Sequence, residues 1–195
     1  MSFIRNTLAL IGLLSLILIA FSTLQIKSTL DIVDSFDEKA IDIYSRFIEK
    51  ILTTGSPLDA MIIKVKVADG LTVEDLQASI RTIANELNIK NVGELPLSEQ
   101  VEAMTGQPYR YVKIYLLCNA MTAASMLNYN DAFASFLPCR ITVIEDEQGA
   151  LWLSTMDLNL MIHGGKPIPP ALKSDAIQIR DDLNEIMLRS AAGDF

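Results

Sequence analysis

The sequence has few of the residues that most often carry chemistry. Among its 195 residues are two cysteines, one histidine and one tryptophan. Two cysteines are too few for a disulfide-stapled scaffold, and they do not form a Cys-x-x-Cys motif. A single histidine excludes most histidine-rich metal sites. Since no catalytic constellation is recognisable either, the sequence favours a protein that is not an enzyme.

Positive charge is also scarce. The chain has 16 Lys and Arg against 24 Asp and Glu, which gives a formal net charge of −8 at pH 7. This balance repels phosphate backbones and no basic cluster offsets it, so nucleic acid is excluded as the expected partner. Half of the residues are hydrophobic and 21% are charged, a composition typical of a folded chain rather than a disordered one.

One long uncharged run lies near the N-terminus. Residues 6–26 read NTLALIGLLSLILIAFSTLQI, and as a helix they would extend about 30 Å, enough for the hydrocarbon core of a bilayer. We expect residues 1–27 to form a transmembrane anchor. The alternative is a cleaved signal peptide with a cleavage site at Ala20-Phe21-Ser22. Because such a segment usually acts as a start signal, we expect a single-pass protein whose C-terminal domain is extracytoplasmic.

Residues 28–57 are expected to form a juxtamembrane amphipathic helix, over residues 28–53, and a linker. Apolar residues in this helix are spaced by 3, 4, 3 and 4 positions: Val33, Phe36, Ala40, Ile43 and Phe47. This heptad spacing predicts an oligomer seam, in which two copies form a short parallel coiled coil above the membrane. The alternative is a single helix that packs on its own domain. Gly55 and Pro57 mark the end of the helix and the domain boundary.

Residues 58–195 are expected to form one globular domain. We predict strands over residues 60–67, 89–95, 111–118, 139–146 and 150–156, and helices over residues 72–88, 98–104, 120–127 and 170–191. Thr72 and Asp75 suit a variant capping box, and Ser98 is a candidate N-cap. Gly149 lies in the turn of a hairpin. This order predicts an α+β fold, a two-layer sandwich with helices on one face of a mostly antiparallel sheet.

Cys118 and Cys139 are the candidate thiol site, because Cys118 ends one predicted strand and Cys139 begins another. If those strands are antiparallel, the two ends share an edge of the sheet and a disulfide becomes possible. If they are parallel, the ends lie beyond the ~7 Å that a disulfide can bridge. A disulfide would close a loop of about 20 residues, worth roughly 3 kcal/mol in the chain-entropy model. The other interpretations are structural thiols and a reactive or metal-binding pair.

Met161 and His163 are weak candidates for metal ligands. A thioether and an imidazole two residues apart, with two thiols elsewhere, could bind a soft metal such as copper(I). The competing interpretation is a solvated or capping loop histidine. Gly164-Gly165-Lys166 lacks the glycine spacing and the Ser or Thr of a phosphate loop. The carboxylates of residues 145–147 are interpreted as a solvated hairpin turn, since no base or calcium-ligand spacing accompanies them.

The chain from residue 62 to about 190 resembles the bacterial and archaeal family called domain of unknown function 302. Cys118-Asn119 closes an apolar strand, and Leu137-Pro138-Cys139 places the second cysteine 21 positions after the first. A hairpin ending in Ser-Thr-Met-Asp follows. The family often has Pro after Cys-Asn, where this chain has Ala120, and Asp-Pro after the hairpin, where it has Asp-Leu. The resemblance implies a compact α+β domain without an established activity, and it transfers no catalytic residue.

Two functional hypotheses follow from these observations. The first is a membrane-anchored extracytoplasmic domain that binds a partner, either as a homo-oligomer or as an accessory subunit of a complex in a bacterial or archaeal cell membrane. The second is a thiol-redox or soft-metal-handling protein that uses Cys118 and Cys139, with Met161 and His163 as further candidate ligands. No cofactor is predicted, and copper belongs only to the second hypothesis.

Overall fold

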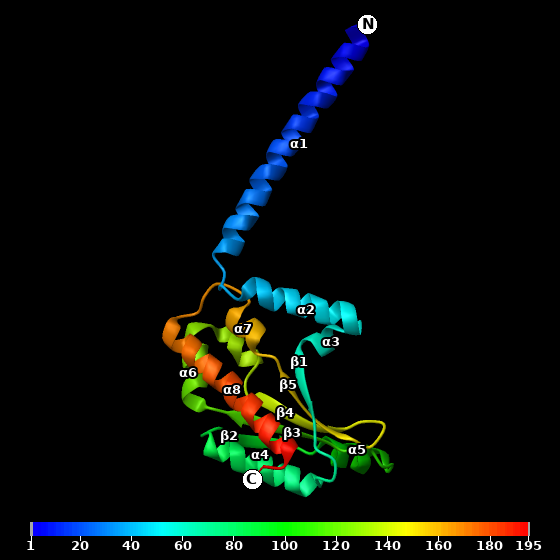
Figure 1. Ribbon diagram of the computed structural model, residues 1–195, viewed down its shortest axis with the longest axis vertical. Coiled ribbons are helices and arrows are strands. Elements are labelled where there is room, and N and C mark those ends of the chain that lie inside the picture. Colours follow the sequence, from blue (N-terminus) through cyan, green and yellow to red (C-terminus); the bar gives the residue numbers. More distant parts are fainter. Residues whose placement is uncertain (1, 195) are drawn as a thin grey trace.

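A long N-terminal helix projects from a folded domain in the computed structural model, which describes residues 2–194 (Figure 1). The helix is α1 (Ser2–Asp34). Its apolar stretch has a mean hydropathy of 2.4 and none of it is buried against the rest of the chain. By length and composition α1 can cross a membrane, and a signal sequence has the same properties.

The chain turns sharply after α1 and enters α2 (Ala40–Thr54), which lies across the top of the domain in Figure 1. The continuous helix predicted over residues 28–53 is therefore wrong, because its first part belongs to α1 and residues 35–39 are not helical. The break has a tertiary cause. The N–H of Asp37 donates to the carbonyl of Gly165 at 2.8 Å, which draws the chain onto the domain.

The residues predicted to form an oligomer seam are divided between α1, the turn after it and α2, and the α2 members pack on the protein's own domain. Ala40 and Ile43 are buried within the single chain, and Val33, Phe36 and Phe47 are half-buried. Helix α2 packs on α7 (Asn159–His163). The structure therefore has the alternative arrangement, one amphipathic helix packed on its domain, in which Ala40 and Ile43 are covered by the chain itself. Self-association through another surface stays a prediction.

The core of the domain is a five-stranded antiparallel sheet. After the short helix α3 (Pro57–Ala60), the strands are β1 (Ile62–Lys66), β2 (Lys90–Leu95), β3 (Val112–Cys118), β4 (Cys139–Glu145) and β5 (Leu151–Met156). Their order across the sheet is β1-β5-β4-β3-β2, and each neighbouring pair is antiparallel. The antiparallel sheet predicted from the sequence is confirmed.

Two long helices, α4 (Val73–Glu86) and α8 (Pro170–Ala192), pack on each other and on one face of the sheet. Their apolar stripes meet the alternate strand residues that point to that face, and the fully buried members include Leu76, Ile80, Leu183, Ile186, Tyr115, Ile141 and Leu153. The predicted capping box is present, since Thr72 and Asp75 bond each other's backbone N–H. These elements confirm the α+β fold.

The remaining elements pack on β3, on α8, on α2 or on each other. They are α5 (Leu97–Thr105), α6 (Ala120–Tyr129) and the 3-10 helix η1 (Asp131–Ser135), in addition to α7. Ser98 is not the N-cap that the sequence suggested, because α5 begins one residue earlier and the Ser98 hydroxyl donates to the carbonyl of Val112 at 3.3 Å. His163 is the last residue of α7 rather than a loop residue.

Candidate functional site

The two cysteines lie at the same edge of the sheet, because β3 and β4 run antiparallel. Their register pairs Cys139 with Leu117, one residue before Cys118. Successive side chains of a strand point to opposite faces of the sheet, so the side chains of Cys118 and Cys139 point to opposite faces. Both thiols are free. The shared edge that would permit a disulfide is therefore present, but the register does not place the two cysteines opposite each other.

The backbone around each cysteine is shaped by its neighbours. The side chain of Asn119 accepts a hydrogen bond from the N–H of Thr122 at 3.2 Å and so caps α6 directly after Cys118. Cys139 follows a cis peptide bond between Leu137 and Pro138. Cys118-Asn119 thus leads into helix α6, and Leu137-Pro138-Cys139 leads into strand β4. The helix and the strand lie on two sides of one space.

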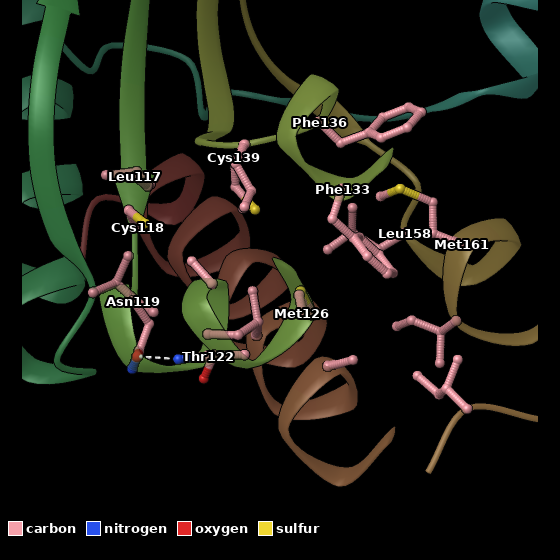
Figure 2. A pocket seen from close by; sticks show the side chains of 17 residues that line it. Leu117, Cys118, Asn119, Thr122, Met126, Phe133, Phe136, Cys139, Leu158 and Met161 are labelled. Carbon is pink, nitrogen blue, oxygen red and sulfur yellow. Dashed lines mark hydrogen bonds between the residues drawn. The ribbon is translucent and has the colours of Figure 1, made fainter. Parts of the chain in front are cut away.

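That space is a cavity of about 40 Å³ lined by residues of β3, β4, α6, η1, α7 and α8 (Figure 2). Nearly all of its lining is apolar. Its side chains include Cys118, Cys139, Met126, Phe133, Phe136, Leu158, Met161 and Ala176. In Figure 2 the Cys139 side chain points from β4 towards Met126 of α6. A cavity of this size can hold one or a few small atoms, such as waters or an ion.

The cavity brings together three of the four candidate ligands from the sequence. Cys118, Cys139 and Met161 line it, and Met126 adds a second thioether that sequence reasoning missed. Four sulfur-bearing side chains thus border one small apolar space. Thiols and thioethers are soft ligands suited to copper(I). Among residues 2–194 no cluster of three His, Cys, Asp or Glu is placed to hold a metal, so any site here depends on the methionines.

Both thiols are held in the protonated form at neutral pH. Burial raises the pKa of Cys139 to about 11, and repulsion from Cys118 adds to the effect. Burial also raises the pKa of Cys118. The thiolate is the nucleophile and the metal ligand, so neither cysteine is activated as in thiol-redox enzymes. Metal binding would have to displace the proton from each thiol that it uses.

His163 does not line the cavity, whereas Met161 does, so the structure does not bring these two candidate ligands into one site. It is buried, with 1% of its surface exposed, and its Nδ1 lies 3.0 Å from Oδ1 of Asp37. An ionised carboxylate only accepts hydrogen bonds, so Nδ1 is the donor. Within the described chain Nε2 of His163 has no hydrogen-bond partner. His163 therefore positions Asp37 rather than completing a site with the cysteines.

Asp37 is the centre of a buried polar joint between the α1–α2 turn and the domain. Its carboxylate also accepts hydrogen bonds from the Lys173 ammonium and, at 3.1 Å, from the N–H of Lys39. Burial alone would raise the pKa of Asp37, but the bonds from Lys173, Lys39 and His163 together lower it to about 2. Tyr44 adds a further bond, from its hydroxyl to the carbonyl of Gly164 at 2.7 Å. No local sequence pattern marks these partners.

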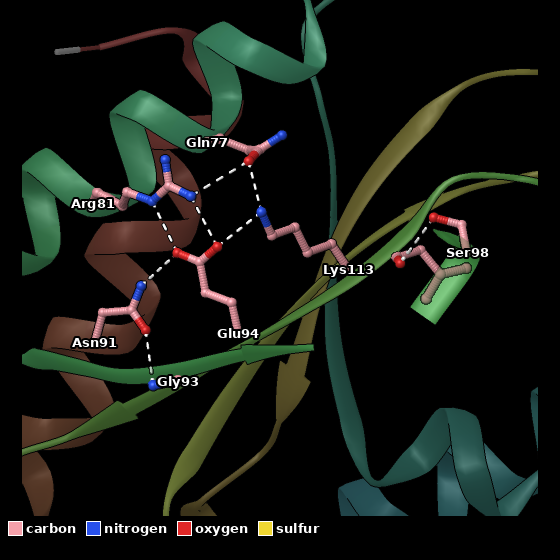
Figure 3. A network of polar contacts seen from close by, with 8 residues as sticks. Gln77, Arg81, Asn91, Gly93, Glu94, Ser98 and Lys113 are labelled. Atoms are coloured by element: carbon pink, nitrogen blue, oxygen red, sulfur yellow. Dashed lines mark hydrogen bonds and ion pairs between the residues drawn. The ribbon is translucent and has the colours of Figure 1, made fainter. Parts of the chain in front are cut away.

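A second polar network lies where α4 meets β2 and β3 (Figure 3). Arg81 binds both carboxylate oxygens of Glu94, at 2.9 and 2.8 Å, and Lys113 and Asn91 donate at 2.8 and 2.7 Å. The bonds from Arg81 lower the pKa of Glu94 to about 2. Gln77 accepts from Lys113 at 2.8 Å and completes the network. Each charge has its partners, so this cluster is structural.

The carboxylates at the hairpin turn are also structural. Asp146 accepts hydrogen bonds from the N–H groups of Gln148 and Ala150 and, at 2.7 Å, from the indole of Trp152. Glu145 accepts from the N–H of Tyr111 at 3.0 Å. These bonds close the turn and align β3 with β4. Within residues 2–194 no metal-ligand cluster includes either residue, which fits the interpretation of residues 145–147 as a turn.

Comparison with known proteins supports the likeness that the two cysteine motifs indicated. A family model described as domain of unknown function DUF302 matches residues 63–189. Among solved structures the chain is similar to the uncharacterized conserved protein DUF302 from Bacillus stearothermophilus, with a TM-score of 0.54, 20% identity, and coverage of 67% of this chain and 98% of that chain. At this identity the structural match shows the fold alone. No curated protein gives a significant match. With most of its length matched by the family model, the chain belongs to the DUF302 family.

Proposed function

We propose that this protein is a single-pass, membrane-anchored domain that works outside the cytoplasm as a binding or accessory subunit. The observation that carries the proposal is the exposed surface of α1, in which no residue of the apolar window is buried by the domain. A monomer rarely leaves an apolar surface of this extent in water. A lipid bilayer covers such a surface, and the helix is long enough to span one.

The Asp37 joint supports an anchor that holds the domain in a defined orientation. Asp37 follows α1 by three residues and is tied to α7 through His163 and to α8 through Lys173. A flexible linker would let the domain rotate freely relative to the membrane, whereas buried charge-assisted hydrogen bonds restrict that motion. An orientation of this kind suits a subunit that presents one face to a membrane partner.

The anchor is tested by washing membranes with carbonate and measuring the intact mass of the retained protein. A retained protein whose mass includes Met1 or Ser2 supports the proposal, and a soluble protein that begins near Thr23 overturns it. Protease added to intact cells or spheroplasts tests the orientation, because only an extracytoplasmic domain is cleaved without lysis.

The partner is tested by chemical cross-linking in native membranes, followed by mass spectrometry. Cross-links between two copies support a homo-oligomer, and cross-links to another membrane protein support an accessory subunit. The predicted seam residues are unsuitable for this test, because they are buried or half-buried in the single chain. Ile43→Asp would bury a charge against the domain, and Phe36→Asp would place one in the half-buried turn before α2, so both would destabilise the chain whatever the oligomeric state.

The second candidate function is soft-metal handling at the cysteine cavity, favoured by the four sulfur-bearing side chains that line it. Copper(I) would bind the Cys118 and Cys139 thiolates with Met126 or Met161, after two protons are released. Titration with copper(I) against a chromogenic chelator under anaerobic conditions tests it. Loss of binding in Cys139→Ser, with binding retained in His163→Gln, supports the site. Equal affinity in wild type and Cys139→Ser overturns it.

A further inference from the structure

A second and larger pocket lies between α2 and the side of the domain formed by β5 and α7. Its volume is about 410 Å³, within the range of about 300–1,000 Å³ that is typical of small-molecule sites. Its apolar wall includes Phe47, Met61, Met156, Leu160 and Met161. We call it the α2 groove. None of the functions discussed above uses it.

Two cations stand on one rim of the α2 groove. Arg46 and Lys50 are one helical turn apart on α2, and both line the groove. The ion pair of Arg46 with Asp42, at 2.9 Å, leaves 61% and 64% of the two side chains exposed, so it is weak and leaves guanidinium donors available. Lys50 donates to the carbonyl of Ile62 at 3.1 Å, and within residues 2–194 it has no carboxylate in ion-pair range. The rim can therefore receive an anion.

One carboxylate, that of Asp157, also lines the groove, and one of its two oxygens accepts hydrogen bonds from α7. Oδ1 of Asp157 accepts from the N–H of Asn159 at 2.9 Å and from its side-chain amide at 2.7 Å. These bonds hold Asp157 at the start of α7. The groove thus has two cations on its α2 side and one carboxylate on its domain side, so its two sides differ in charge.

The apolar wall suits a flexible hydrocarbon chain. Three of its members, Met61, Met156 and Met161, are methionines, whose unbranched side chains repack around irregular ligands. Met161 and Phe136 line both the α2 groove and the cysteine cavity. In Figure 2 these two side chains lie beside each other at the edge of the cavity. A chain lying along the methionines would thus end against a wall of Met161 and Phe136, with the cavity behind it.

We propose that the α2 groove binds one long-chain fatty acid. Its carboxylate lies between Arg46 and Lys50, where the guanidinium can bind both oxygens. Its hydrocarbon chain follows the three methionines towards Phe136. One pair of cations and one apolar channel match a single-chain anion better than a two-chain phospholipid. The site belongs to the folded domain, so it is present whether or not α1 is retained as an anchor.

The test is photo-cross-linking of the full-length protein in phosphatidylcholine nanodiscs. The probe is a palmitic acid analogue with a diazirine near its methyl end, and labelled peptides are located by mass spectrometry. The expected labels lie in residues 156–161 and at Phe136. Arg46→Glu with Lys50→Glu should lower this labelling by about a hundredfold, since each of the two charge-assisted hydrogen bonds is worth about tenfold in affinity. The matched control is Lys64→Glu with Lys66→Glu, two exposed lysines of β1.

Two further measurements separate specific binding from partition into the bilayer. Met161→Trp narrows the groove from the apolar side and should also lower labelling. The thermal unfolding of Arg46→Glu with Lys50→Glu should stay within about 5 °C of wild type, since one exposed ion pair and one exposed hydrogen bond are lost. The uncharged alcohol that carries the same diazirine should label residues 156–161 weakly. Labels confined to α1, or equal labelling by the acid and the alcohol, overturn the proposal. So does undiminished labelling in Arg46→Glu with Lys50→Glu.

Discussion

Replacing Asp37 with Asn should lower the free energy of unfolding by about 2 kcal/mol at pH 7. Burial opposes ionisation of Asp37, yet the hydrogen bonds from Lys173, the Lys39 N–H and His163 lower its pKa from 3.8 to about 2. A depression of this size stabilises the ionised carboxylate by about 2 kcal/mol, at ~1.4 kcal/mol per pKa unit. Only 1% of the side chain is exposed, so solvent screening does not reduce this figure.

The same bonds fix the sign of the pH dependence. Since the pKa of Asp37 is lower in the folded state than in the unfolded state, its stabilisation is complete above about pH 4. The contribution is then lost as the pH falls through about 2, where the folded carboxylate takes up a proton. The wild type should therefore lose more stability than Asp37→Asn between about pH 4 and pH 2.

The assay is urea denaturation of the full-length protein in detergent, followed by the fluorescence of Trp152, the single tryptophan. The control is Asp42→Asn, because Asp42 is 64% exposed in its ion pair with Arg46 and should change stability by under about 0.5 kcal/mol. A double-mutant cycle with Lys173→Met should give a coupling energy of about 1–3 kcal/mol. The reasoning fails if Asp37→Asn is no less stable than the control, or if the cycle shows no coupling.

Three other substitution sets test separate parts of the structure. Glu94→Gln should lower the free energy of unfolding by about 2 kcal/mol at pH 7, since hydrogen bonds from Arg81 lower the pKa of Glu94 to about 2 and the side chain is 23% exposed. The variant should also lose less stability than wild type between about pH 4.5 and pH 2. An acid profile like that of wild type would contradict the network. Alkylation by iodoacetamide at pH 7 should modify Cys139 more slowly than Cys118, because burial raises the pKa of Cys139 to about 11; equal rates in the native state, read by mass spectrometry, would contradict the burial. Gly164→Ala should destabilise by about 1–3 kcal/mol, since its Cβ would lie 2.4 Å from the carbonyl oxygen of Leu160, whereas Gly165→Ala meets nothing within 4 Å and should be close to neutral in the same denaturation assay.

Local sequence patterns predicted most of the secondary structure. The alternation in residues 139–156 and the turn at Gly149 predicted the β4–β5 hairpin, which the structure contains. The pairing of Thr72 with Asp75 predicted the start of α4, and both capping bonds are present. These features depend on residues within a few positions of one another, so a single sequence is enough to find them.

The helix over residues 28–53 shows where local patterns fail. Its heptad spacing is real, but a heptad pattern says only that one face is apolar and not which surface covers it. The domain covers it, and the helix breaks because Asp37 bonds Gly165 and His163, the latter 126 positions along the chain. The spacing therefore correctly predicts an amphipathic helix, but tertiary packing decides which surface covers its apolar face.

By itself the sequence determined the apolar N-terminal segment, the α+β domain and the two cysteine motifs, because hydropathy and periodicity are properties of neighbouring residues. Only the tertiary structure decided how the candidate residues meet. The β3–β4 register sets Cys139 opposite Leu117, the cavity gathers Cys118, Cys139 and Met161, and His163 turns away to Asp37. These placements depend on contacts between residues far apart in the chain, whose energies no local pattern records.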